Sequence, residues 1–195
     1  PLHVAFEGDQ QRGQSFRMRD FIGDANSAEK PTTLDPQIFN RFNWLADLQA
    51  SGLATSVSVA QEMTEIWIKR NRNWSARSWN MDCLAERICN WISASNFILA
   101  GADPDFSQLF AQSMACHANH LEIAVRFGEP VPPAFGVQKA MIYCGIALDN
   151  HSRLFVSGLR MLQKSIDEEI HSDGGHVSRN PSLQLQALRH LIEVR

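Results

Sequence analysis

The chain has 195 residues, of which 44% are hydrophobic and 20% are charged. This composition is ordinary for a soluble globular protein of one domain, or for part of a larger one. The formal net charge is -3 and no block of lysine and arginine stands out, so nucleic acid is excluded as an expected partner. No stretch approaches the ~20 apolar residues that a membrane span needs.

The two ends of the chain suggest a piece of a longer protein. The sequence begins with Pro1 rather than Met, shows no signal peptide, and ends at Arg195 inside an apolar-periodic run. We therefore expect a fragment, whose compartment the sequence leaves open. The four cysteines lie in apolar helical patterns without a CxxC pair, so buried free thiols are favoured over disulfides at Cys83, Cys89, Cys116 and Cys144.

Residues 1–34 are polar and irregular, and we interpret them as loop, with possible short strands at 4–6 and 16–22. Helical patterns fill the rest, 35–195. Three of them begin at a capping residue followed by proline, which favours a helix start. Glycine ends two of the helices, at Gly52 and at Gly101. The expected helices span about 35–52, 56–71, 81–100, 103–127, 135–148, 151–171 and 180 onward.

Most links between these helices are short, and short links force neighbouring helices to run antiparallel. No residue signature of a tetratricopeptide or ankyrin array repeats along the chain. The sequence therefore predicts an all-α fold of helical hairpins, either an irregular bundle or an incomplete α/α toroid. In a toroid, the loops at one end line a cleft.

One loop between two expected helices carries polar chemistry, HSDGGHVSRNP at residues 171–181. Its paired glycines allow tight backbone turns that other residues avoid. His176 is suited to proton transfer near neutral pH, and Arg179 can clamp a carboxylate with two hydrogen bonds. These two residues predict chemistry on an acidic substrate. The alternative is a helix-terminating glycine pair with a structural histidine.

A second polar loop, NRNWSARSWN at 71–80, interleaves aromatic and basic residues. Indole faces stack on sugar rings and arginines hold uronates, so Trp74, Trp79 and Arg77 could form a carbohydrate platform. Aromatic anchors that pin the loop to the core are an equal alternative.

Two further groups of ionisable residues predict little. His117 and His120 share a helix face but have no obvious third ligand, so a partly exposed polar edge is favoured over zinc. The acidic run 167–169 is interpreted as a solvated helix face, because adjacent helical positions point in different directions. It is a weak candidate for the paired carboxylates of a glycoside hydrolase.

Three stretches together resemble the heparinase II/III family of bacterial polysaccharide lyases. FNRFNWLADLQASG (39–52) is similar to its aromatic-rich F-x-W-L-x-D-L helix, and LAERICNWI (84–92) to its R-[IV]-x-N-W-I segment. DGGHVSRNP (173–181) is similar to its D-G-G-H-x-x-R-[SN]-P loop, and GADPDF (101–106) fits the helix start between the last two. The resemblance covers about residues 36–195.

The resemblance implies an incomplete α/α toroid, followed in the complete protein by an antiparallel β-sandwich domain as a partner. It implies cleavage of uronic-acid polysaccharides by β-elimination. We expect no cofactor and no metal. A group must neutralise the uronate carboxylate, a base must take the adjacent proton, and an acid must protonate the leaving oxygen. The expected catalytic residues are His176 and Arg179, and the expected substrate-binding residues include Asn90 and Asn180. A lyase of this family would be periplasmic.

The chain departs from the family pattern at two positions. The loop of many members continues as R-S-P-x-Y-H with a catalytic tyrosine, and Leu183 stands there. The family's Asn-His pair falls near 132–133, where this chain has two prolines, unless Asn150 and His151 replace it. The only tyrosine, Tyr143, lies in an apolar helical pattern.

These departures leave three hypotheses. The first is a lyase domain acting on an acidic polysaccharide by β-elimination. The second is a carbohydrate-binding domain of the same family that does not cut its ligand. The third and weakest is a glycoside hydrolase on an α/α toroid, which would need two facing carboxylates.

Overall fold

The fold is taken from a computed structural model, which describes residues 8–15, 36–128 and 135–195. Within these ranges the secondary structure is helical, which confirms the all-α class. The possible strands at 4–6 and 16–22, the capping residue Asp35 and the prolines at 132–133 lie outside the described residues. Chain contacts divide the described residues into two compact units, one from Gly8 to Ala115 and one from Cys116 to Arg195. Each unit is described by itself.

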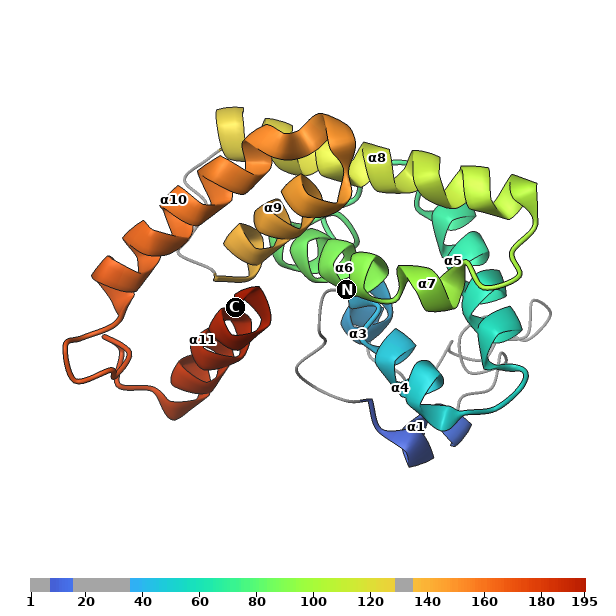
Figure 1. The fold of residues 1–195 in the computed structure, drawn as a ribbon, viewed down its shortest axis with the longest axis horizontal. Helices are drawn as coiled ribbons and strands as arrows, with labels where there is room; N and C mark the ends of the chain where they lie inside the picture. The colour runs from blue at the N-terminus through green and yellow to red at the C-terminus, as the bar shows by residue number, and fades with distance from the viewer. Residues whose placement is uncertain (1–7, 16–35, 129–134) are drawn as a thin grey trace. The chain divides into compact units, whose positions relative to one another are not determined.

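The first unit is built on short and medium helices, drawn from blue to green in Figure 1. They are α1 Gln10–Ser15, α3 Pro36–Arg41, α4 Trp44–Ser51, α5 Ser56–Arg70, α6 Met81–Ser93 and α7 Ser95–Ile98, followed by α8 Pro104–Phe127, which contains the unit boundary. Asp103 caps α8 as its sequence predicts, because its carboxylate accepts a hydrogen bond from the amide of Phe106 at 2.7 Å. Gly52 and Gly101 follow their helices with left-handed backbone angles.

A cluster of aromatic rings forms the core of this unit. Phe42 is fully buried, and its ring centroid lies 5.4 Å from that of Trp67 and 5.1 Å from that of Trp91. Trp91 also contacts Phe110 on α8, with 5.1 Å between centroids. These edge-on and tilted contacts are the arrangement that aromatic pairs prefer.

The same cluster explains why the predicted helix over 35–52 is wrong as a single element. Phe42 adopts a left-handed φ of 63°, which ends α3 before α4 begins at Trp44. Such an angle is unfavourable for a bulky residue. Here it brings Phe42 and Trp44 to a centroid distance of 5.0 Å inside the core, and burial of both rings offsets the strain.

Helix α1 corrects the expectation of loop throughout 1–34. Arg12 donates through Nε to Oδ2 of Asp47 at 2.5 Å, and the amide of Asp9 donates to Oδ1 of the same carboxylate at 2.7 Å. A side chain at Gly13 would lie 1.9 Å from the carbonyl oxygen of Asp47. The buried Asp47 and this close approach therefore fix α1 on α4.

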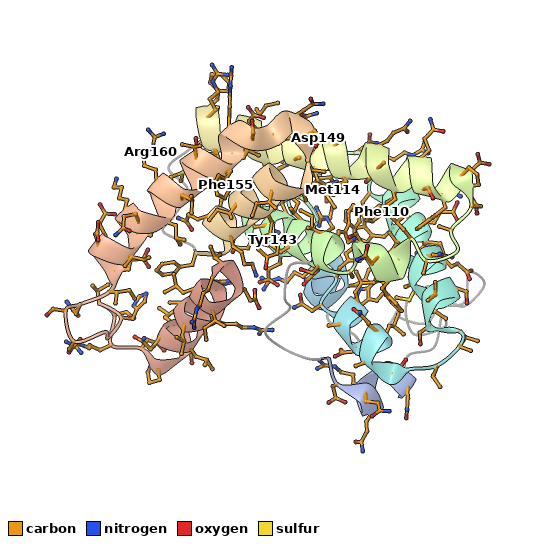
Figure 2. The ribbon with its side chains drawn as sticks, viewed as in Figure 1. Phe110, Met114, Tyr143, Asp149, Phe155 and Arg160 are labelled. Carbon is orange, nitrogen blue, oxygen red and sulfur yellow. The ribbon has the colours of Figure 1, made fainter. Side chains whose placement is uncertain are left out.

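The second unit contains α9 Phe135–Ala147, the short 3-10 helix η1 Asp149–His151, α10 Ser152–Glu169 and α11 Pro181–Val194. Helix α10 lies along α9, and a loop then leads to α11, which also contacts α9 (Figure 1). At Gly145 a side chain would lie 2.4 Å from the backbone of Phe155, so the small residue allows α9 and α10 to touch (Figure 2). An apolar cluster joins the three helices through Phe135, Ile142, Leu162 and Ala187.

The thiols follow the sequence interpretation in part. None of the four cysteines, all of which the structure describes, forms a disulfide; Cys83, Cys89 and Cys144 are buried, whereas Cys116 is exposed. None of the helices in the described ranges is long and apolar enough to cross a membrane.

Candidate functional site

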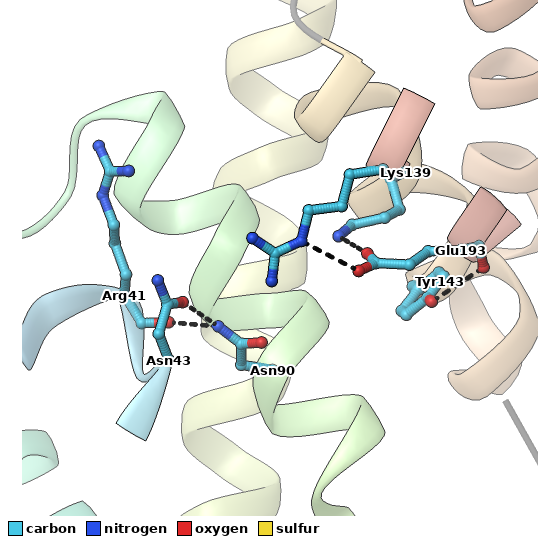
Figure 3. A network of polar contacts seen from close by, with 7 residues as sticks. Arg41, Asn43, Asn90, Lys139, Tyr143 and Glu193 are labelled. Atoms are coloured by element: carbon cyan, nitrogen blue, oxygen red, sulfur yellow. Dashed lines mark hydrogen bonds and ion pairs between the residues drawn. The ribbon is translucent and has the colours of Figure 1, made fainter. Parts of the chain in front are cut away.

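The residues predicted as a site fall in both units. Trp74, Arg77, Trp79 and Asn90 belong to the first unit, and His176, Arg179 and Asn180 belong to the second. The structure therefore presents two separate groups, whose relation to a common ligand stays a prediction. Figure 3 draws the Asn90 contacts in the same view as a polar network of the second unit.

In the first group, the two tryptophans have opposite environments. Trp79 is buried at 6% exposure and donates from its indole nitrogen to the carbonyl of Asn71 at 3.1 Å, so it anchors the loop to the core. Trp74 is 66% exposed, and Arg77 is exposed as well. Of the predicted platform, Trp74 thus keeps an indole that a ligand can reach.

Asn90 is engaged in bonds that join two segments of the first unit. Its amide nitrogen donates to the carbonyl of Arg41 at 2.8 Å and to the side-chain oxygen of Asn43 at 2.7 Å (Figure 3). Both acceptors flank the break between α3 and α4. Asn90 therefore stabilises the backbone beside the left-handed Phe42.

In the second group, the loop between α10 and α11 is closed by its own hydrogen bonds. The amide of Val177 donates to the carbonyl of Glu169 at 2.8 Å, and the amide of His171 donates to that of Gly175 at 2.8 Å. Gly174 has a left-handed φ of 82°, which the tight turn requires. Gln184 at the start of α11 accepts a hydrogen bond from the amide of His176 and donates to the carbonyl of Gly174 at 3.1 Å.

This framework buries the His176 side chain against a carboxylate. Nε2 of His176 lies 3.3 Å from Oε2 of Glu169, and each of the two side chains is 10% exposed. On its other edge, Nδ1 accepts a hydrogen bond from the amide of Ser178 at 3.1 Å and lies 2.8 Å from the Ser178 hydroxyl oxygen. The arrangement is a chain from a buried carboxylate, through an imidazole, to an exposed hydroxyl.

Burial raises the pKa of the Glu169 carboxyl, while the hydrogen bond and charge of His176 act in the opposite direction. Its second oxygen, Oε1, is buried without a hydrogen-bond partner in the described part of the chain. Burial of a carboxyl group away from water in this way favours its neutral, protonated form over the charged carboxylate. Glu169 is therefore paired with His176 at a position where burial penalises the charge of the carboxylate.

Arg179 and Asn180 lie at the exposed end of this loop. The Arg179 guanidinium pairs with the Asp173 carboxylate at 2.9 Å, and both side chains are more than half exposed. The amide of Gly175 and this guanidinium hold the pKa of the Asp173 carboxyl below its usual value. Asn180 caps α11 by accepting from the amide of Ser182 at 2.9 Å. Its side chain thus has a structural role, and its contact with a ligand stays a prediction.

The interpretation of 167–169 as a solvated face is wrong for Glu169. Asp167 and Glu168 do face solvent, with partners four residues earlier on the same helix, Gln163 and Lys164. Glu169 instead continues the buried stripe of α10, which runs through Leu154, Gly158, Leu162 and Ser165. The helical register of that stripe is the signal by which the sequence could have identified Glu169.

A second group of buried ionisable side chains joins α9 to α11 in the same unit. Lys139 forms an ion pair with Glu193, and the hydroxyl of Tyr143 donates to the backbone carbonyl of Glu193 at 3.1 Å (Figure 3). Burial, and then the charge of Lys139, lower the pKa of His190 to about 4. In the described ranges, no three His, Cys, Asp or Glu side chains gather as metal ligands would.

The fold class that these observations define is all-α, with a polar loop between α10 and α11. No family model and no solved structure matches the chain. The chain is 26% identical over 171 residues to FtsZ-localized protein C of Caulobacter vibrioides. That match covers 87% of this chain but 29% of the relative, so the chain spans less than a third of the length of that protein.

Proposed function

We propose that this chain is the helical domain, arranged as an incomplete α/α toroid, of a heparinase II/III-like protein that cleaves uronic-acid-containing glycans by β-elimination. The observation that carries the proposal is the chain of contacts from Glu169 through His176 to Ser178, which is suited to moving a proton. The same resemblance adds a C-terminal β-sandwich domain in the complete protein and a periplasmic location.

The exposed end of the loop supplies the charge that an acidic glycan requires. Arg179 carries a guanidinium that is 62% exposed and whose pairing with Asp173 is open to solvent. A uronate carboxylate can compete for this guanidinium through two parallel hydrogen bonds. Neutralising that carboxylate acidifies the adjacent carbon–hydrogen bond, and the histidine chain then receives the proton.

The test is an assay for the unsaturated product, which absorbs ultraviolet light. The complete protein that carries this chain is incubated with heparin, heparan sulfate, alginate and hyaluronan. We expect absorbance to rise with at least one polymer, to vanish in His176→Ala, and to persist in His171→Ala, whose side chain is exposed in the same loop. A wild-type protein that gives no product from any uronate polymer contradicts β-elimination.

A non-catalytic carbohydrate-binding domain is the second candidate. Leu183 at the family's tyrosine position supports it, and so does the exposed indole of Trp74. This candidate predicts saccharide binding that weakens in Trp74→Ala and in Arg179→Ala without any cleaved product. Calorimetric titration of the same polymers measures it, and undiminished binding by both variants would rule it out.

The similarity to FtsZ-localized protein C supports a further proposal about location. We infer that the protein carrying this chain also gathers where FtsZ does in dividing cells, because the matched segment covers most of the chain. A fluorescent fusion imaged together with labelled FtsZ tests this, and a diffuse signal in dividing cells would contradict it. A reporter that is active only in the periplasm tests the compartment that the lyase resemblance implies.

A further inference from the structure

The His176 imidazole has no ring nitrogen open to a ligand. Nε2 faces Glu169 at 3.3 Å, and Nδ1 faces both the amide and the hydroxyl of Ser178. The side chain is also 10% exposed. If His176 takes part in proton transfer, another group must therefore carry the proton between the imidazole and the substrate.

The hydrogen bonds fix which nitrogen of the neutral ring carries the proton. The amide of Ser178 can only donate, so Nδ1, which lies 3.1 Å away, must present its lone pair. The ring proton then resides on Nε2, where it points to the carboxylate of Glu169. This carboxylate orients the ring and stabilises the imidazolium that forms when Nδ1 accepts a proton.

The Ser178 hydroxyl is oriented in a similar way. Its oxygen accepts a hydrogen bond from the amide of Asn180 at 3.2 Å, which leaves its own hydrogen free to point to Nδ1 of His176 at 2.8 Å. Ser178 is exposed, unlike Glu169 and His176. The hydroxyl is thus the solvent-facing end of the chain.

We propose that the Ser178 hydroxyl is the catalytic group that exchanges protons with a uronate-containing glycan, that His176 holds the proton in transit, and that Glu169 is the positioning residue. The proposal rests on the function proposed above. In the loop pattern of the resembled family, the hydroxyl comes from a tyrosine, and Leu183 stands at that position here. The Ser178 hydroxyl would take its place.

The proton count of this reaction balances within the protein and the glycan. The serine oxygen takes the proton from the carbon beside the uronate carboxylate as its own proton passes to Nδ1 of His176. The electron pair left on carbon forms the carbon–carbon double bond, and the glycosidic carbon–oxygen bond breaks. His176 returns its proton to the serine oxygen, and the serine hydroxyl protonates the departing oxygen. The protein ends as it began.

The test compares Ser178→Ala with Ser172→Ala, a matched change at an exposed serine of the same loop. In the ultraviolet assay on the complete protein, we expect Ser178→Ala to lower kcat by roughly 10²-fold to 10⁴-fold with little change in KM. Ser172→Ala should retain the wild-type kcat. A Ser178→Ala variant with wild-type kcat, beside an inactive His176→Ala, would overturn the role of Ser178 and leave the lyase function standing. A wild-type protein without product would overturn both.

A second measurement is independent of turnover. Nitrogen-15 chemical shifts of the His176 ring at neutral pH report which nitrogen is protonated. We expect protonation on Nε2 and a bare Nδ1 in the wild-type protein. A neutral ring with its proton on Nδ1 would overturn the proposal, because that nitrogen then has no lone pair to receive the serine proton.

Discussion

The guanidinium of Arg87 lies over the indole of Trp67, with 4.3 Å between its Cζ atom and the ring centroid. Arg87 is fully buried, and its Nη1 atom donates to the carbonyls of Asn40 and Ser78, both at 2.9 Å. Burial lowers its pKa to about 9. The aromatic face and the two carbonyls thus stabilise a charge far from water.

Replacing Arg87 should destabilise the first unit. Arg87→Ala leaves two buried carbonyls without a donor and opens a cavity beside Trp67, so we expect the free energy of unfolding to fall by about 3 kcal/mol or more. Urea denaturation measures the change. Arg72→Ala, at an exposed loop position, is the control and should stay within about 0.5 kcal/mol of wild type. Equal midpoints for the two variants would contradict a structural role for Arg87.

Glu169 should make stability decrease as pH rises. Its pKa is raised above 4.5 in the folded protein, so the folded state retains a proton that the unfolded state has lost. The stabilisation that Glu169 gives the folded state is therefore fully present below about pH 4.5. It is lost as the pH rises through the pKa of Glu169 in the folded state. Glu169→Gln removes this loss. Relative to wild type, the variant should gain stability with increasing pH, whereas exposed Glu168→Gln should not. A Glu169→Gln variant that loses stability relative to wild type as the pH rises above about 4.5 would refute the expectation.

His190 should have the opposite pH dependence. Its pKa is about 4 when folded and about 6.5 when unfolded, so the unfolded state binds the proton first as pH falls. Its contribution to the free energy of unfolding is fully present above about pH 6.5. This contribution, up to about 3 kcal/mol, is lost as the pH falls toward 4. His190→Gln should flatten the stability profile in this window, as read from urea midpoints. An unchanged slope would show that folding does not lower the pKa of His190.

Asn180 combines a cap with a predicted ligand contact, and two substitutions separate these roles. Asn180→Ala removes the bond to the amide of Ser182 and should cost about 1 kcal/mol of stability. Asn180→Ser keeps a capping oxygen and should stay close to wild type in thermal denaturation. If glycan binding weakens equally in both variants while only the first is destabilised, the amide itself contacts the ligand. Loss of binding in Asn180→Ala alone would assign Asn180 to the cap.

Helix boundaries were predictable from sequence where local chemistry decides them. Proline begins α3, α8 and α11, and Gly52 and Gly101 take the left-handed angles that their positions predict. The break at Phe42 was not predictable in this way, because its angle is stabilised by rings from α5 and α6 that are distant in sequence. The intrinsic backbone preference of phenylalanine argues against this angle, and only the tertiary packing around Phe42 offsets the strain.

The loop of the candidate site was predictable from the sequence, but the side chains that contact His176 were not. The glycines and His176 marked the polar turn between α10 and α11. The sequence did not distinguish buried Glu169 from exposed Asp167 and Glu168, because an acidic run at a helix end is usually solvated. It also did not single out Ser178, whose proposed role depends on its contact with His176.

The measurement that tests the central claim most directly is the ultraviolet trace of the complete protein with the panel of uronate polymers, run beside His176→Ala and His171→Ala. We predict rising absorbance for wild type and for His171→Ala, and a flat trace for His176→Ala. A flat trace for the wild-type protein with every polymer, or a rise that His176→Ala leaves unchanged, would contradict a lyase that depends on this loop.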